Sequence, residues 1–146
     1  MEHVEYKIEI AATAKKVWNT MLEDATYRQW AGKGWPDSFY QGKWIQGEKI
    51  RFIGADGSGT LAEIRDLKPH RHILVRHVAI LEKGGNEDTT SEMAKGWIGI
   101  SEAYNFNDHN GRTTLTIAIQ TRPEWKQMFD DGWPAALEEL KRLSEK

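Results

Sequence analysis

The first clear pattern along the chain is an alternation of apolar and polar residues near the N-terminus. Val4, Tyr6, Ile8 and Ile10 occupy every second position, and charged residues occupy the positions between them. Successive side chains of a strand point to opposite faces of a sheet. Residues 3–10 are therefore predicted to form a half-buried antiparallel strand, with one face that needs an apolar partner.

Two short helices and a loop are predicted next. Thr13 precedes apolar residues at helical spacing, and we expect its hydroxyl to cap that helix. Asp24 is expected to cap a second short helix, which carries Trp30. The Gly- and Pro-containing segment 31–38 then predicts a loop around Trp35.

Beyond residue 39 the helical spacing gives way to short strands separated by turn signals. Segment 41–54 predicts one short and one longer strand, and Asp56-Gly57 and Asn110-Gly111 predict turns. The later strands are expected at residues 59–67, 73–81, 97–107 and 113–120. Segment 83–95 is polar and contains glycine, so it predicts a loop. Sequential strands joined by short turns pair antiparallel, which predicts one antiparallel sheet.

The last part of the chain carries a stripe of large apolar residues. Trp125, Phe129, Trp133, Leu137 and Leu140 follow one another at steps of four, four, four and three residues. This spacing places them on one face of a long helix. Burying each ring removes about 150–250 Å² from water, or at most about 4–6 kcal/mol. Such a helix needs a wide apolar partner, and the apolar face of the sheet is the only one the sequence offers.

The boundaries of this helix carry their own signals. Thr121 and Glu124 have the spacing of a capping box, with Pro123 in the first turn. Gly132 and Pro134 fall inside the helical pattern, so we expect a kink or a break there.

Composition narrows the class of protein. The length of 146 residues predicts a single domain spanning residues 1–146. A net charge of −2 with no basic face argues against nucleic acid as a partner, and the absence of cysteine excludes disulfides and thiolate chemistry. No apolar run reaches the roughly 18 residues of a membrane span, and the N-terminal residues lack a signal-peptide pattern. A cytoplasmic protein is expected, and no motif for a cofactor is present.

Three stretches of the sequence match a known family: IEIAATAKKVWNTM, GWIGISEAYNF and FDDGWPAALEELKRLSE. Together with the order of the elements, they make the chain resemble the activator of heat-shock-protein-90 ATPase homologue family, within the START/SRPBCC (birch-pollen-allergen-like) superfamily. The resemblance implies a helix-grip α+β fold. In that fold a curved antiparallel sheet of about six or seven strands wraps a long C-terminal helix and leaves a cavity between them. Relatives include carriers, receptors, cyclases and proteins of unknown role.

Glu102 is the first candidate for chemistry. It shares a strand face with Tyr104 and Phe106, so an inward strand would bury its carboxylate unless a bulge turns it outward. A carboxylate on an apolar face costs several kcal/mol unless it is paired, so it could anchor a ligand or act as a general base. Alternatively, it forms a structural ion pair or lies at a mouth open to water. The candidate ion-pair partners are Arg65, Arg76 and His77.

Three histidines are considered as metal ligands or as catalytic residues. His70 and His72 could share a face, but no third ligand is evident, so we expect solvated side chains and no metal site. His77 lies in the middle of an apolar strand. We interpret it as a core or surface histidine in preference to a catalytic one, although acid–base catalysis stays an alternative.

Several tryptophans surround the expected cavity. Trp30, Trp35 and Trp44 either line its mouth or form a satellite cluster under the loop. The aromatic rings of the C-terminal stripe either pack as ordinary core or line the cavity. The candidate ligand-binding residues are Glu102, Tyr104, Trp30, Trp35, Trp125, Phe129 and Trp133.

Three functions follow from these expectations. The preferred hypothesis is a binding protein for a hydrophobic small molecule, held between the sheet and the C-terminal helix. The first alternative is a cyclase- or dehydratase-like enzyme that uses Glu102 or His77. The second, less favoured, is an interaction module with a chaperone partner, which requires an exposed apolar patch around Trp35 and Trp44.

Overall fold

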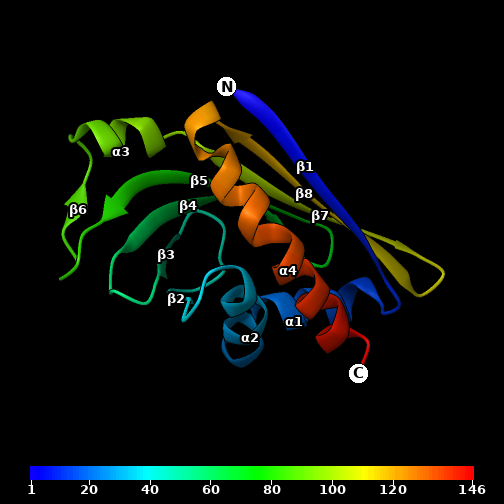
Figure 1. Ribbon diagram of the computed structural model, residues 1–146. Coiled ribbons are helices and arrows are strands. Elements are labelled where there is room, and N and C mark those ends of the chain that lie inside the picture. The colour runs from blue at the N-terminus through cyan, green and yellow to red at the C-terminus, as the bar shows by residue number, and fades with distance from the viewer.

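The computed structural model describes all 146 residues and shows an α+β protein built on a curved antiparallel sheet (Figure 1). Its strands are β1 (Glu2–Ile10), β2 (Phe39–Gln41), β3 (Lys49–Ile53), β4 (Gly59–Lys68), β5 (His72–Leu81), β6 (Glu87–Asp88), β7 (Ser101–His109) and β8 (Arg112–Thr121). They pair in the order β1-β8-β7-β5-β4-β3-β2, and the two-residue β6 pairs with β5 at one end. Each strand is antiparallel to its neighbours, as the short turns predict.

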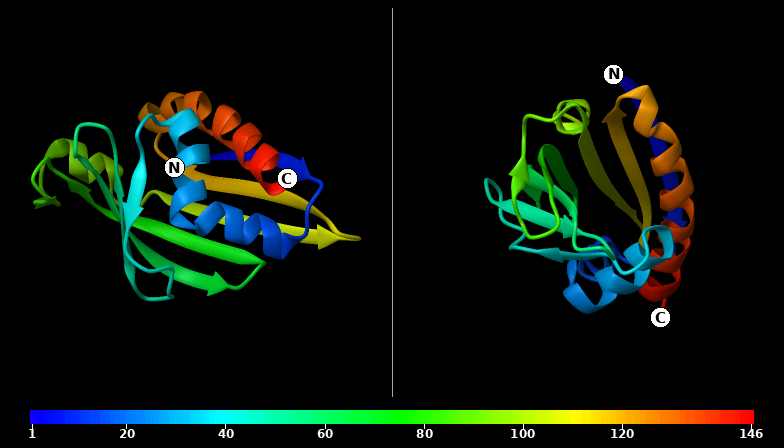
Figure 2. Two further views of the ribbon diagram at one scale, coloured as in Figure 1. Left: turned by 90° about the horizontal axis from the view of Figure 1, so that it is seen from below. Right: turned by 60° about the vertical axis from the view of Figure 1, so that its left-hand side comes forward.

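The helices gather on one face of this sheet. They are α1 (Ala14–Leu22), α2 (Asp24–Gly34), α3 (Glu92–Trp97) and α4 (Lys126–Ser144), with a 3-10 turn at Pro123–Trp125. The long α4 crosses the concave face, while α1 and α2 lie at one end of the sheet and α3 at the other (Figure 1). Figure 2 shows the sheet curling around the space that α4 and α2 cover. The helix-grip architecture is therefore confirmed.

The N-terminal strand and its cap are also confirmed. Val4 and Ile10 of β1 are buried on the concave side, while the charged residues between them are exposed. The Thr13 side chain accepts a hydrogen bond from the backbone N–H of Lys16, as a helix N-cap does. The predicted turn at Asn110-Gly111 joins β7 to β8 with positive φ at both residues, which is the geometry of a type I′ hairpin.

The C-terminal helix runs unbroken through the predicted kink. Pro134 cannot donate to the carbonyl of Asp130, but its ring is exposed, so water can satisfy that carbonyl on the outer side. Gly132 has a different role. A Cβ on Gly132 would lie 2.5 Å from two atoms of the Trp35 ring, and a Cβ on Gly34 would collide with the Gly132 backbone. The two glycines thus let α2, Trp35 and α4 approach closely.

Several predicted boundaries are wrong. Asp24 lies in the first turn of α2, and Glu23 precedes that turn without a capping side chain. The helix α2 continues to Gly34, so the loop begins at Trp35 and not at residue 31. Helices are set by backbone hydrogen bonds, and Gly34 at the end of α2 is tolerated because the Gly132 backbone of α4 packs against it.

The polar segment before β7 is more ordered than its composition predicts. Residues 83–95 contain β6 and most of α3, and the Ser91 hydroxyl caps α3 by accepting from the N–H of Ala94. Trp97 therefore ends a helix, and the following strand begins only at Ser101. The expected capping box is absent because Thr121 is still the last residue of β8, where its hydroxyl donates to the carbonyl of Arg122.

One main core lies between the concave face of the sheet and the helices. Fully buried aliphatic residues of β1, β8, α1 and α4 fill one end, and aromatic residues dominate the other. A second, small cluster of Leu61, Ala79 and Leu81 forms beyond a bulge at Val78, where the register between β4 and β5 shifts. None of the helices combines the length and the hydropathy needed to cross a membrane.

Candidate functional site

An apolar cavity lies at the aromatic end of the core, bounded by the sheet, α2 and α4. Its volume is about 270 Å³, and 13 of the 21 residues around it are hydrophobic. Ser38 and the β3–β4 turn with the exposed Asp56 border it at the surface, while Glu102 and Trp133 are buried on its inner side. The cavity is thus an apolar pocket with a few polar groups, which is the usual composition of a small-molecule site.

Glu102 and His77 form a buried pair on the inner wall of this pocket. In the β5–β7 register Val75 faces Glu102, so His77, two residues further along β5, lies on the same concave face. The His77 Nε2 atom lies 2.6 Å from Glu102 Oε2, and the two residues are only 2% and 7% exposed. The sequence left open whether Glu102 pairs with Arg65, Arg76 or His77, and in the structure its partner is His77. Arg65 and Arg76 are exposed, and no bulge turns Glu102 outward.

Two tyrosine hydroxyls lie near this pair. The Tyr104 hydroxyl donates a long hydrogen bond of 3.4 Å to Glu102 Oε1. Burial raises the pKa of Tyr104 well above its ordinary value, and the negative charge of Glu102 adds to the effect. Burial also raises the pKa of Tyr27, and the negative charge of Glu102 again adds to the effect. Both side chains therefore stay neutral hydrogen-bonding groups at physiological pH.

Tryptophan rings form much of the wall. The pocket is lined by Trp30, Trp35, Trp44, Trp97 and Trp133. Trp133 packs edge-on against Trp35 with ring centroids 5.3 Å apart, and stacks on Trp30 at 5.9 Å. Trp97 packs against His77 with centroids 4.6 Å apart. The rings belong to the main core, so Trp30, Trp35 and Trp44 are not a separate satellite cluster.

The predicted ligand-binding residues all border this pocket except Trp125. Phe129 and Trp133 extend from α4, and Trp30 and Trp35 come from α2 and its end. Trp125 lies in the 3-10 turn outside the pocket, where its indole N–H donates to the Gly96 carbonyl. It therefore supports the pocket wall indirectly, by packing edge-on against Trp97 with centroids 5.2 Å apart.

Sequence reasoning missed three of the nine aromatic lining residues. Trp97 was expected on a strand, and only the helix α3 explains how its ring reaches the pocket. Tyr27 and Phe52 lie on elements that were predicted, but nothing in the spacing of Phe52 distinguishes a pocket position from a core position. A signal was available for Tyr27, because it precedes Trp30 by one helical turn.

The side chains of His70 and His72 have different surroundings in the structure. His70 adopts a positive φ in the turn before β5, and its ring meets the edge of Trp18. His72 Nδ1 lies 2.7 Å from Asn105 Oδ1 on the neighbouring strand. Their rings thus engage different partners, and no group of three His, Asp or Glu side chains has the geometry of a metal site.

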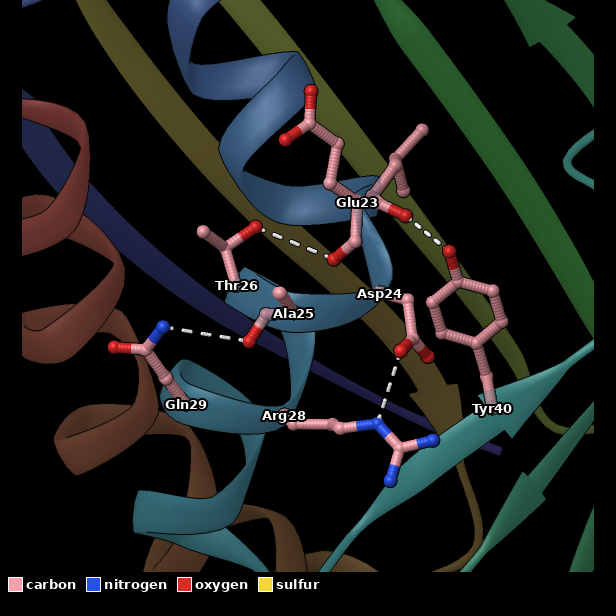
Figure 3. A network of polar contacts seen from close by, with 8 residues as sticks. Glu23, Asp24, Ala25, Thr26, Arg28, Gln29 and Tyr40 are labelled. Carbon is pink, nitrogen blue, oxygen red and sulfur yellow. Dashed lines mark hydrogen bonds and ion pairs between the residues drawn. The ribbon is translucent and has the colours of Figure 1, made fainter.

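A polar network holds α2 against β2 beside the mouth of the pocket (Figure 3). The Tyr40 hydroxyl of β2 donates to the carbonyl of Leu22, where α1 ends and α2 begins. Thr26 donates to the Glu23 carbonyl, and Arg28 pairs with Asp24 one turn away. These contacts fix the start of α2, and through it the positions of Tyr27 and Trp30.

Four polar atoms on pocket-lining residues have no hydrogen-bond partner. They are Trp44 Nε1, His77 Nδ1, Trp97 Nε1 and Trp133 Nε1. By contrast, the Trp30 indole donates to the Met21 carbonyl at 3.1 Å. Buried polar atoms without partners are costly, and four of the five in the protein lie on residues that line this pocket.

Comparisons with known proteins agree with this architecture. The profile of the family described as "Activator of Hsp90 ATPase homolog 1-like protein" matches residues 11–145. No curated protein sequence matches the chain significantly.

Similar solved structures share the fold at low sequence identity. A protein from Arthrobacter aurescens is 18% identical with a TM-score of 0.75, over 97% of this chain and 85% of that one. The Aha1 dimer from Colwellia psychrerythraea is 17% identical with a TM-score of 0.74, over 99% and 97%. DynU16, from the dynemicin biosynthetic locus, is 17% identical with a TM-score of 0.71, over 97% of this chain but only 46% of that protein.

Proposed function

Because the chain belongs to the family of Activator of Hsp90 ATPase homolog 1-like proteins, we propose that it binds a small, largely apolar molecule in the pocket beneath α4. The observation that carries this proposal is the cavity of about 270 Å³ with mostly hydrophobic walls and a buried polar pair on its inner side. A largely apolar pocket with a few convergent polar groups is the usual form of a small-molecule site.

The polar groups supply orientation. Glu102, His77 and the Tyr104 hydroxyl lie together on one wall, while the rest of the lining is largely aromatic. Apolar burial would contribute most of the affinity, and the polar wall would select one orientation of the guest. The location of DynU16 in a biosynthetic locus for a natural product is consistent with a fold that handles small organic molecules.

Tryptophan fluorescence tests the proposal directly. We expect apolar aromatic compounds to shift or quench the emission of the wild-type protein, because five tryptophans border the pocket. Replacing Trp133 by Phe should reduce that response. The matched control is Trp18→Phe. Trp18 lies on α1, packs against Phe106 of β7 and does not line the pocket. A response that is lost equally in both variants, or absent for every compound, overturns the proposal.

A second candidate function is acid–base catalysis by the same pair. The 2.6 Å contact between Glu102 and His77 Nε2 orients the imidazole and leaves Nδ1 without a partner. A carboxylate that orients a histidine in this way is the usual arrangement of a general base. This candidate predicts that a bound carbon acid exchanges hydrogen for deuterium in D₂O. The exchange, measured by NMR, should vanish in His77→Gln while binding persists; exchange at the uncatalysed rate in the wild type would exclude this role.

The interaction-module alternative has less support. Trp35 and Trp44 are half-buried and pack on the core, and do not form the exposed patch that a chaperone partner requires. The large hydrophobic side chains that are exposed, Met1, Ile45 and Met93, lie on separate segments. Single exposed apolar residues of this kind are common on protein surfaces.

A further inference from the structure

We propose that the molecule held in this pocket is a small organic cation of the ammonium type. The inference rests on the proposed binding function and adds the charge of the ligand to it. Three independent features of the lining carry it: the absence of basic side chains, the buried carboxylate of Glu102, and the arrangement of the aromatic rings.

The charged residues around the pocket have one sign. None of the 21 lining residues is Lys or Arg, whereas two are carboxylates, Asp56 at the exposed rim and Glu102 inside. A ligand carboxylate or phosphate would enter beside Glu102 with no lysine or arginine to pair with. Burying such a charge without a partner is strongly unfavourable. Apart from His77, the lining offers no group that could pair with a fatty acid or another organic anion, so it favours a cation over an anion.

Glu102 itself lacks a permanent counter-charge. Its ion-pair partner is His77, and its remaining side-chain hydrogen bond comes from the neutral Tyr104 hydroxyl. A neutral imidazole can donate its Nε2 proton to Glu102 and still leave the full negative charge in the pocket. A ligand cation would supply the balancing charge. Burial is the main cause of the raised pKa of Tyr104, and the negative charge of Glu102, which adds to that shift, would also oppose a ligand anion.

Aromatic rings face the cavity from several directions. Nine Trp, Tyr and Phe side chains border it; some neighbouring rings stack nearly parallel, such as Trp30 and Trp133, and others meet at steep angles. Trp133 lies at 84° to Trp35 and at 60° to Tyr104, and Tyr27 lies at 75° to Trp30. Aromatic walls that meet at such angles surround a guest from several sides. Ring faces attract ammonium groups, most strongly when water is excluded, which is how aromatic cages bind quaternary ammonium ions.

A set of matched probes separates charge from shape. The cation is 4-(trimethylammonio)phenol, its neutral isostere is 4-tert-butylphenol, and the anion is 4-tert-butylbenzoate. Affinity is measured by calorimetry and by shifts of the tryptophan indole N–H signals in NMR spectra. We expect the cation to bind at least about tenfold more tightly than the neutral phenol, because a desolvated cation–π contact has that magnitude. The benzoate should bind most weakly of the three.

Glu102→Gln tests the source of the preference. The amide keeps a hydrogen-bonding group beside His77 but removes the charge, so the affinity ratio of cation to neutral phenol should fall several-fold. Glu48→Gln is the matched control, because Glu48 is exposed and lies outside the pocket. Its ratio should equal that of the wild type.

The possible outcomes are distinguishable. Binding of 4-tert-butylphenol at least as tight as that of the cation overturns the charge inference but leaves the proposed binding function intact. Tightest binding of the benzoate does the same. No binding of any probe to the wild-type protein overturns both.

Discussion

The two ends of the core are built on the same sheet and beneath the same helix, yet they differ in packing. At one end, side chains such as Ile10, Leu115 and Leu140 are fully buried among residues of α1, α4, β1 and β8, and none of these three lines the pocket. At the other end, large rings and the Glu102–His77 pair surround a cavity. Branched aliphatic side chains interdigitate closely, whereas rigid rings that meet edge to face leave space between them. The aliphatic end therefore stabilises the fold, and the aromatic end is available for a ligand.

The largest effect is expected at alkaline pH. The pKa values of all four tyrosines are raised, chiefly by burial, and three of them, Tyr27, Tyr40 and Tyr104, belong to the aromatic end. An unfolded tyrosine ionises near its ordinary pKa of about 10. The stability that these groups provide is thus complete below pH 10 and is lost as the pH rises above it.

This expectation is checked with two spectra. Tyrosinate absorbance at 295 nm should rise together with the loss of far-UV circular dichroism, well above pH 10, whereas the protein in guanidinium should titrate near pH 10. If half of the absorbance change occurred at pH 10 while the circular dichroism spectrum stayed intact, the tyrosines of the aromatic end would be open to solvent in the folded protein.

Truncation in the aliphatic end should cost the most among single substitutions. Leu140 is fully buried in α4, and Leu140→Ala would leave a cavity that its packed neighbours cannot fill. We expect the free energy of unfolding to fall by about 2–5 kcal/mol, measured by urea denaturation. A loss below 1 kcal/mol would show that this end is as loosely packed as the pocket, and would remove the contrast between them.

Gly132 tests how tightly the pocket wall is held. In Gly132→Ala the new methyl group must displace the Trp35 ring, so we expect a loss of about 1–3 kcal/mol despite the better helix propensity of alanine. Gly32→Ala is the matched control, because a Cβ at Gly32 meets no atom within 4 Å. That variant should be as stable as the wild type or slightly more stable. Equal stability of the two variants would mean that Trp35 moves freely.

The smallest effect is expected where a ring borders the cavity. Phe52 is half-buried and lines the pocket, so Phe52→Leu enlarges an existing space and creates no new one. We expect a loss of stability below about 1.5 kcal/mol, together with weaker binding of aromatic ligands. Denaturation and ligand titration on the same sample check both parts. A loss comparable to that of Leu140→Ala would show that Phe52 is part of the rigid core.

Much of the architecture could be predicted from local patterns. The alternation in β1, the Asn110-Gly111 turn and the spacing of Phe129 and Trp133 each depend on contacts within a few residues, and each is confirmed. Strand parity also predicted that Glu102 and Tyr104 face inward together. The resemblance to a family supplied the helix-grip arrangement, which the matched profile over residues 11–145 supports.

Other features depended on distant contacts. The sequence suggested that Gly132 weakens α4, but in the fold this glycine makes room for Trp35, about a hundred residues earlier in the chain. Trp97 reaches the pocket because it lies at the end of α3, a helix that Ser91 caps within the polar segment that was predicted to be a loop.

The sequence by itself determined which faces are apolar, where most strands turn, and that a carboxylate points inward, because these follow from the period of the backbone and the nature of each residue. Only the tertiary structure decided that His77 is the partner of Glu102 and that the rings beside them leave a cavity. The reason is physical: both results depend on how side chains from separate strands and helices approach one another in three dimensions, and no local pattern records those distances.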